Sequence, residues 1–348
     1  MPTLSQVHID AALASLAVAL ANDPQSFLLA RACRVVAVPN YSDKFYVFGR
    51  AYGARRSAMG TDARAAASAR RPAARATEID YTLSTEPFVA NEYSLAQLVP
   101  DQVIANADRP LRPVINSAAQ LVSSLRIDAE SVLARVIADP DNYPATHKTT
   151  LTTGGTGTSW LSYASANTDP LEDLRTGKEV LRKYLQTEPN TLLLSAYAAA
   201  VLADAPAIKD IVKYTDPTYL TGSGLPKRLR GLDVVIGDAV FDSAAEGGAA
   251  SLDYVFVDAN LSNACAIICH VPKTSELLFP GSFLCFQVTS LTEGQAAPLN
   301  PGLSVRAYRD EPRKGWVVEA SLPFDVRPAL QDASDLITGA YAIFSATV

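Results

Sequence analysis

Thiols and imidazoles are the groups with which this chain could do nucleophilic chemistry, and they are few. The three histidines, His8, His147 and His270, lie in different segments, and Cys269 directly precedes His270. Neighbouring residues of a strand point to opposite faces, so a thiolate at Cys269 and a base at His270 would face apart. A hydrolase that uses Cys269 or a serine with His270 and an acid therefore remains only as an alternative.

The four cysteines, Cys33, Cys265, Cys269 and Cys285, are too few and too scattered for a disulfide scaffold, and we expect them to be reduced. Cys265 and Cys269 share one face of a strand, where two small buried thiols are the simplest interpretation. A zinc site needs more ligands at tighter spacing than this C-x3-C-H pattern supplies. The sequence therefore predicts no metal site here.

A glycine-rich stretch, TTGGTGTS at 152–159, resembles a phosphate-binding loop only superficially. A lysine at the Walker position is missing, and the stretch is not set between a strand and a helix. We expect a plain loop there. Taken together, these segments predict no catalytic residue and no cofactor, so the chain is not expected to be an enzyme.

Positive charge gathers in the segment 50–76, which has few large apolar side chains and a single acid, Asp62. Its seven arginines are Arg50, Arg55, Arg56, Arg64, Arg70, Arg71 and Arg75. Such a segment buries too little apolar area to fold by itself. An acidic surface of a neighbouring protein is the favoured partner, because the rest of the chain holds surplus acid. A solvated loop and nucleic acid are the alternatives, but Tyr52 alone offers a ring for base stacking.

Strand patterns flank this basic segment on both sides. Residues 44–50 alternate in the strand manner, and strand character resumes at 79–95. Two strands around a long excursion form an extended hairpin arm. A loop of about 25 residues without a core of its own is uncommon inside a compact domain, so we expect this one to lie on a neighbouring subunit.

One long helix is predicted over 109–138, capped by Asp108 and ended by Pro140. Its length would be about 45 Å, which is more than one compact core needs. The residues expected to pack along its apolar stripe are Leu111, Ile115, Leu121, Leu125, Leu133 and Val136. The opposite face, which includes Asp128 and Glu130, is expected to face solvent or another polar surface. We expect the stripe to pack on a hairpin around Trp316 and Val318.

The remaining segments suggest a mixed fold of class α+β. An amphipathic helix is predicted over 4–21 and a second helix over 169–188, capped by Asp169. The part from 188 to 295 alternates strands and helices, which favours an α/β unit with a mixed sheet. The tail is predicted to form an antiparallel hairpin over 302–326 and a last short strand.

Composition excludes some classes of function. The chain has 348 residues and a net charge of −6, which disfavours a surface that grips nucleic acid without sequence preference. No run of about 18 apolar residues occurs, so no membrane span is expected. The N-terminal segment lacks a basic residue before its apolar part, so no signal peptide is expected.

The order of these parts resembles a tailed-bacteriophage major capsid protein of the Hong Kong 97-like fold. Several phrases spread over nearly the whole chain also resemble one group of these proteins, among them LVPDQVIANAD, DPLEDLRTGKEVLRKYLQTEPNTLLLS, VVIGDAVFDSAAEGGAASLDYVFVD and YRDEPRKGWVVEAS. The resemblance implies an N-terminal arm, an extended loop, a peripheral domain with the long spine helix, an axial domain and a closing peripheral hairpin with a C-terminal strand. Their expected limits are 1–39, 40–98, 99–187, 188–295 and 296–348.

The same resemblance implies a structural head protein that self-assembles into hexamers and pentamers of an icosahedral virion shell around double-stranded DNA. Assembly would take place in the host cytoplasm. A separate scaffolding protein is expected, because no long scaffolding segment precedes the arm, and a portal and a decoration protein are further expected partners. The packaged DNA would be contacted only weakly, since the chain is acidic. An encapsulin-like nanocompartment shell is the alternative within this fold.

Overall fold

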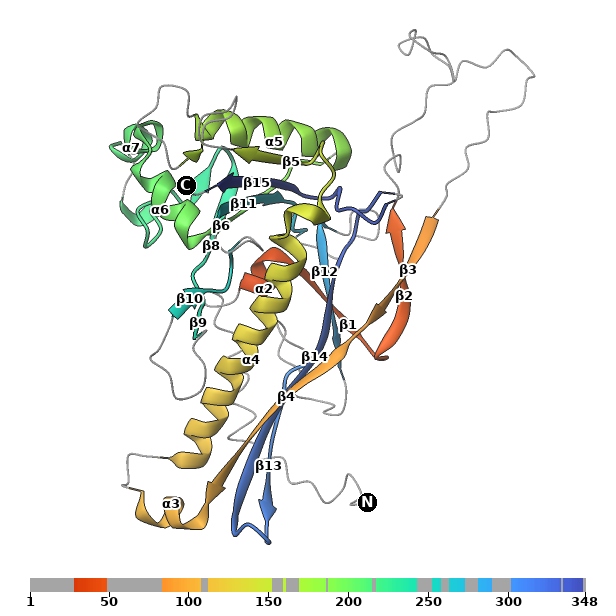
Figure 1. The fold of residues 1–348 in the computed structure, drawn as a ribbon, viewed down its shortest axis with the longest axis vertical. Coiled ribbons are helices and arrows are strands. Elements are labelled where there is room, and N and C mark those ends of the chain that lie inside the picture. Colours follow the sequence, from red (N-terminus) through yellow and green to blue (C-terminus); the bar gives the residue numbers. More distant parts are fainter. Residues whose placement is uncertain are drawn as a thin grey trace, which may run out of the picture.

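The computed structural model describes residues 28–48, 83–107, 112–151, 159–160, 169–185, 187–214, 217–242, 252–257, 263–272, 281–289, 302–332 and 334–346. The helix predicted over 4–21, the glycine-rich loop at 152–158, Leu111 and all seven arginines of the segment 50–76 lie outside the described residues. The described residues form two large sheets, one along the lower part of the molecule and one across its upper part, and two smaller sheets of two strands each (Figure 1).

The lower sheet is organised by one 14-residue strand, β14 (Gly315–Pro328). One edge of β14 pairs with β4 (Asn91–Pro100), and the other pairs first with β13 (Ser304–Asp310) and then with β12 (Phe283–Val288), all antiparallel. The fifth strand, β1 (Arg34–Val38), runs parallel to β12. The predicted hairpin of the tail is confirmed in β13 and β14, and together these strands make the sheet long and narrow.

The predicted long helix is present as α4 (Pro113–Ile137), which lies along the lower sheet (Figure 1). A short helix, α3 (Asp101–Asn106), joins it to β4, and the turn η2 (Pro140–Asn142) follows it. Arg112 has non-helical backbone angles and makes no side-chain cap, so the helix begins four residues later than predicted. Pro113 stands at the first position, where its missing N–H has no intrahelical partner to lose.

The apolar stripe of α4 contacts two different cores. Near its start it packs with Val318, and further along it packs with the core between the two sheets. Leu121, Leu125 and Leu133 are buried, whereas Ile115 and Val136 are half-buried and pack against these cores. The predicted packing on the hairpin is confirmed at Val318, whereas the Trp316 side chain is 37% exposed and is not among the buried residues of that core.

The opposite face of α4 is not wholly in solvent. Glu130 is 4% exposed, because the short helix α2 (Leu28–Ala32) covers it. The prediction that Glu130 faces solvent or another polar surface is therefore wrong, because the residues of α2 that cover it belong to an apolar core. A stripe pattern shows that a helix has one apolar face, but it does not show whether a second element covers the other.

The upper sheet has six strands of mixed direction. Their order is β5 (Lys148–Leu151), β15 (Tyr341–Ala346), β11 (Asn263–Cys269), β6 (Thr191–Ser195), β8 (Leu232–Gly237) and β7 (Arg228–Leu229). One face packs on three helices, α5 (Pro170–Leu185), α6 (Ala196–Asp204) and α7 (Pro206–Val212). The other face packs on α2, the end of α4 and the lower sheet. Smaller elements are η4 (Pro217–Tyr219) and the pair β9 (Val240–Asp242) and β10 (Leu252–Tyr254).

The two sheets do not follow the expected limits at 188 and 295. The strand β12 lies inside that range but belongs to the lower sheet, while β5 and β15 lie outside it and complete the upper sheet. A short apolar run indicates a strand, but it does not indicate which sheet the strand joins. The mixed sheet itself is as predicted.

Candidate assembly surfaces

The hairpin predicted around the basic segment is present at its base. The strands β2 (Ser42–Phe48) and β3 (Leu83–Val89) pair antiparallel, from Ser42 opposite Val89 to Phe48 opposite Leu83. They stand at one side of the molecule (Figure 1). Residues 48 and 83 are therefore neighbours, so the two described residues that flank the segment 49–82 lie side by side.

Aromatic side chains fix this base to the lower sheet. The rings of Phe88 and Phe286 are stacked with centroids 4.3 Å apart, and Phe45 lies 5.0 Å from Phe286. The carboxylate of Asp325 accepts hydrogen bonds from the backbone N–H of Val89 at 3.0 Å and from Nε of Arg327 at 2.8 Å. A stacked aromatic pair stabilises a contact by more than the burial of its apolar area alone. The hairpin base is therefore held firmly on the lower sheet.

Two groups stand out among the large apolar side chains that are exposed in the described part of the chain. Tyr41, Tyr46 and Val89 are 41%, 58% and 50% exposed on or beside the hairpin base. At the end of α7, Tyr214 is 92% exposed and Tyr219 of η4 is 66% exposed. Exposed apolar groups that gather in one region are typical of protein interaction surfaces. The sequence analysis did not single out either group.

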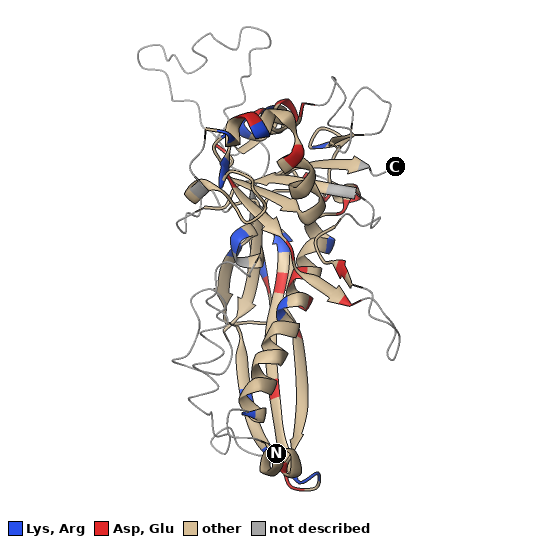
Figure 2. Cartoon of the chain, turned by 90° about the vertical axis from the view of Figure 1, so that its left-hand side faces the viewer, with Lys and Arg blue, Asp and Glu red and all other residues tan. Residues whose placement is uncertain are grey.

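The far end of the lower sheet carries ion pairs. The guanidinium of Arg309 makes two hydrogen bonds to the Asp101 carboxylate, at 2.9 and 3.1 Å, and so ties the β13–β14 hairpin to α3. Arg306 pairs with Glu319 at 2.7 Å across the same two strands. Figure 2 shows that basic and acidic residues lie close together at the lower end of the molecule. The sequence analysis did not name these ion pairs.

The thiol and imidazole groups do not form a nucleophilic site. All four cysteines are buried, and burial raises the pKa of Cys269 to about 12, so its thiol stays protonated at neutral pH. The Nδ1 atom of His270 lies 3.0 Å from the carbonyl oxygen of Glu188. This geometry gives no support to a hydrolase built on Cys269 and His270.

Other kinds of site were sought in the described part of the chain. No group of three or more His, Cys, Asp or Glu residues there could hold a metal ion. None of the helices described is long and apolar enough to cross a membrane. An open groove of about 1340 Å³ runs beside β6 and β8, but its charged lining is of both signs, with Arg31 and Lys227 against Asp233 and Asp238.

Comparison with known proteins gives the fold a context. No family model matches the chain. The major capsid protein of Burkholderia phage BcepMu is 22% identical over 130 residues, which are 37% of this chain and 40% of that relative. The match therefore spans less than half the length of that curated relative.

Solved structures match over nearly the full length. A phage-related protein from Bordetella bronchiseptica has a TM-score of 0.66 and 22% identity over 97% of both chains. The capsid structure of cyanophage P-SCSP1u has a TM-score of 0.55 and 11% identity, over 100% of this chain and 93% of that chain. The chain has a phage capsid fold. The Hong Kong 97-like class predicted from the sequence is thereby confirmed, whereas the limits of its arm, loop and domains stay a prediction.

Proposed function

We propose that this chain is the major capsid protein of a tailed phage, a structural subunit that assembles into hexamers and pentamers of an icosahedral shell around double-stranded DNA. The observation that supports this function most is the capsid fold over the full length of the chain. The curated relative that is named a major capsid protein adds to it.

In this function the firm hairpin base positions the segment 49–82 for contact with a neighbouring subunit. Its arginines would pair with acidic groups of that neighbour. A single exposed ion pair contributes about 0 to 1 kcal/mol. The same contact recurs at every subunit boundary, so the total free energy of these ion pairs over a closed shell becomes large.

The exposed side chains described above fit the same proposal. Tyr41, Tyr46 and Val89 lie on or beside the hairpin base, Tyr214 follows α7, and Tyr219 lies in η4. We propose that neighbouring copies cover both groups. A separate scaffolding protein, a portal and a decoration protein are proposed as further partners, and the DNA is proposed to touch the acidic chain only weakly.

Negative-stain microscopy of the purified full-length chain tests the proposed function. Closed shells or ring-shaped capsomers are the expected result. A compact monomer that persists at every salt concentration would contradict it. Particles from the native source that enclose a protein cargo without DNA would favour the nanocompartment shell instead.

The basic segment is tested by removing its charge without shortening the chain. Replacing the seven arginines by glutamine is expected to leave a folded subunit, as judged by circular dichroism, that forms no closed shells. The matched control replaces the same seven positions by lysine, which keeps the charge and is expected to keep assembly. Normal shells from the glutamine variant would show that these charges are not needed, and deletion of 54–75 would then test the segment itself.

A further inference from the structure

A buried carboxyl group lies in the middle of α4, where the sequence predicts a side chain that faces solvent or another polar surface. Glu130 is 4% exposed, beneath the first turn of α2. Its Oε1 atom accepts a hydrogen bond from the backbone N–H of Leu28 at 3.2 Å. Among the described residues, no partner lies within hydrogen-bonding distance of Oε2.

The elements around Glu130 belong to different parts of the chain. Leu28 and Leu29 of α2 are 4% and 0% exposed, and they share one core with Ala134 of α4 and Val235 of β8. The carboxyl group therefore lies at an interface of α2, α4 and the upper sheet. Leu28 directly follows residues 1–27 in the chain.

The charged groups near this interface have opposite effects on the ionisation of Glu130. Arg126, one turn before Glu130 on α4, favours the ionised carboxylate, and Asp238, which follows β8, disfavours it. Arg31 of α2 is attracted to Asp233 of β8. Burial is the largest effect, and it raises the pKa of Glu130 to about 7, although the Leu28 N–H partly offsets it.

We propose that Glu130 is a latch through which pH controls how firmly the first turn of α2 is held on α4. The neutral carboxyl group can be buried at this interface and still accept the Leu28 N–H. The ionised group keeps the same hydrogen bond but loses its water, and burial of a carboxylate with so few partners costs free energy. A side chain that served only as an acceptor would not need to be ionisable.

The direction of the pH effect follows from linkage. When α2 opens, Glu130 regains water and its pKa returns to the ordinary value of 4.5. The folded-state pKa is the higher one, so the stabilisation of the closed state is complete below pH 4.5 and is lost as the pH rises through about 7. With these two values the opening equilibrium increases about tenfold between pH 6 and pH 8.

Hydrogen exchange of the full-length protein measures this opening. The amides of residues 28–33 are followed at pH 6 and pH 8, after correction for the intrinsic pH dependence of exchange, with the β11 strand as internal reference. Wild-type protein is expected to show about tenfold weaker protection of these amides at pH 8. The Glu130→Gln variant keeps an acceptor oxygen and is expected to show the same protection at both pH values.

Two matched variants make the test specific. Asp128→Asn removes a half-buried carboxylate from the same helix, and it is expected to leave the pH dependence unchanged. Asp238→Asn removes an exposed negative charge that disfavours ionisation of Glu130. The midpoint of the pH-dependent loss of protection is therefore expected to move to lower pH.

The latch is overturned if wild-type protection of residues 28–33 does not change between pH 6 and pH 8, or if Glu130→Gln retains the change. If Glu130→Gln fails to fold, the Asp238→Asn variant tests the proposal instead. A midpoint of its pH-dependent protection equal to that of the wild type would contradict the proposal. Because the measurement needs no assembled shell, its outcome is independent of the proposed capsid function.

Discussion

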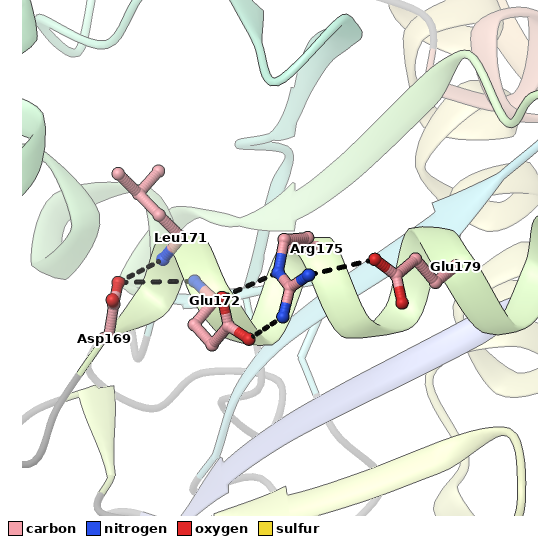
Figure 3. A network of polar contacts seen from close by, with 5 residues as sticks. All are labelled: Asp169, Leu171, Glu172, Arg175 and Glu179. Carbon is pink, nitrogen blue, oxygen red and sulfur yellow. Dashed lines mark hydrogen bonds and ion pairs between the residues drawn. The ribbon is translucent and has the colours of Figure 1, made fainter.

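The helices α5 and α4 are both amphipathic in sequence, but they are stabilised differently. At the start of α5, Oδ1 of Asp169 accepts the N–H groups of Leu171 and Glu172 at 3.1 and 3.3 Å (Figure 3). On its exposed side, Arg175 lies between Glu172 and Glu179 and pairs with both. These contacts all lie within one segment of the chain.

By contrast, α4 has no side-chain cap at its start and buries a carboxyl group in its middle. It is covered on one side by the lower sheet and on another by α2. The comparison shows that residues near in sequence specify the start of α5, whereas α4 depends on residues distant in sequence. Substitutions in the two helices should therefore differ in size and kind.

The largest effect is expected in the doubly covered part of α4. Leu133 is 0% exposed, and Leu133→Ala should lower the free energy of unfolding by about 2 to 5 kcal/mol, because it leaves a cavity. Arg135→Ala, on the exposed side of the same turn, is the control and should change little. Urea unfolding followed by circular dichroism measures both. Equal changes in the free energy of unfolding for the two variants would mean that the neighbours of Leu133 close the cavity and that the substitution costs no stability.

A smaller loss is expected where α5 approaches the upper sheet. A Cβ atom on Gly177 would lie 2.7 Å from Cδ1 of Tyr341 and 2.9 Å from Cδ1 of Ile268. Gly177→Ala should therefore cost about 1 to 3 kcal/mol of stability, although the same change on an open helix surface is stabilising. Thr176→Ala, at the exposed neighbouring position, serves as control in the same unfolding assay. A stabilised Gly177→Ala protein would show that the helix can move away from the sheet.

The smallest effect separates the two helix starts. Asp169→Ala removes the cap of α5 and should cost about 1 kcal/mol. Arg112→Ala, at the uncapped start of α4, should stay within about 0.5 kcal/mol of the wild type. Thermal unfolding of the two variants in parallel measures the difference. A larger loss at Arg112 would contradict the observation that no side chain caps the start of α4.

Prediction from sequence succeeded where neighbouring residues set the structure and failed where distant residues set it. The start of α5 was predicted because Asp169 and Pro170 lie next to the helix that they begin. The start of α4 was placed too early because Asp108-Pro110 and Pro113 give equally good local signals. Glu130 was misplaced because α2, which covers it, is about a hundred residues away, and its five residues carry no strong helix signal.

The candidate assembly surfaces also include features that the local sequence predicted and features that it did not. Alternating residues on both sides of the basic segment predicted the hairpin of β2 and β3. The stacking of Phe88 on Phe286 was not predictable, since nothing local pairs two rings so far apart in the sequence. Sheet membership failed for the same reason at β12 and β15, each of which is a short apolar strand that either sheet could accept.

The strand β14 has a mechanical consequence. It is paired with β4 along ten consecutive residues on one edge and with β13 and β12 on the other. A force along β14 would therefore load many ladder hydrogen bonds in shear at once, whereas a force across it would break them one at a time. The lower half of the molecule should resist tension along its length far better than peeling from its side.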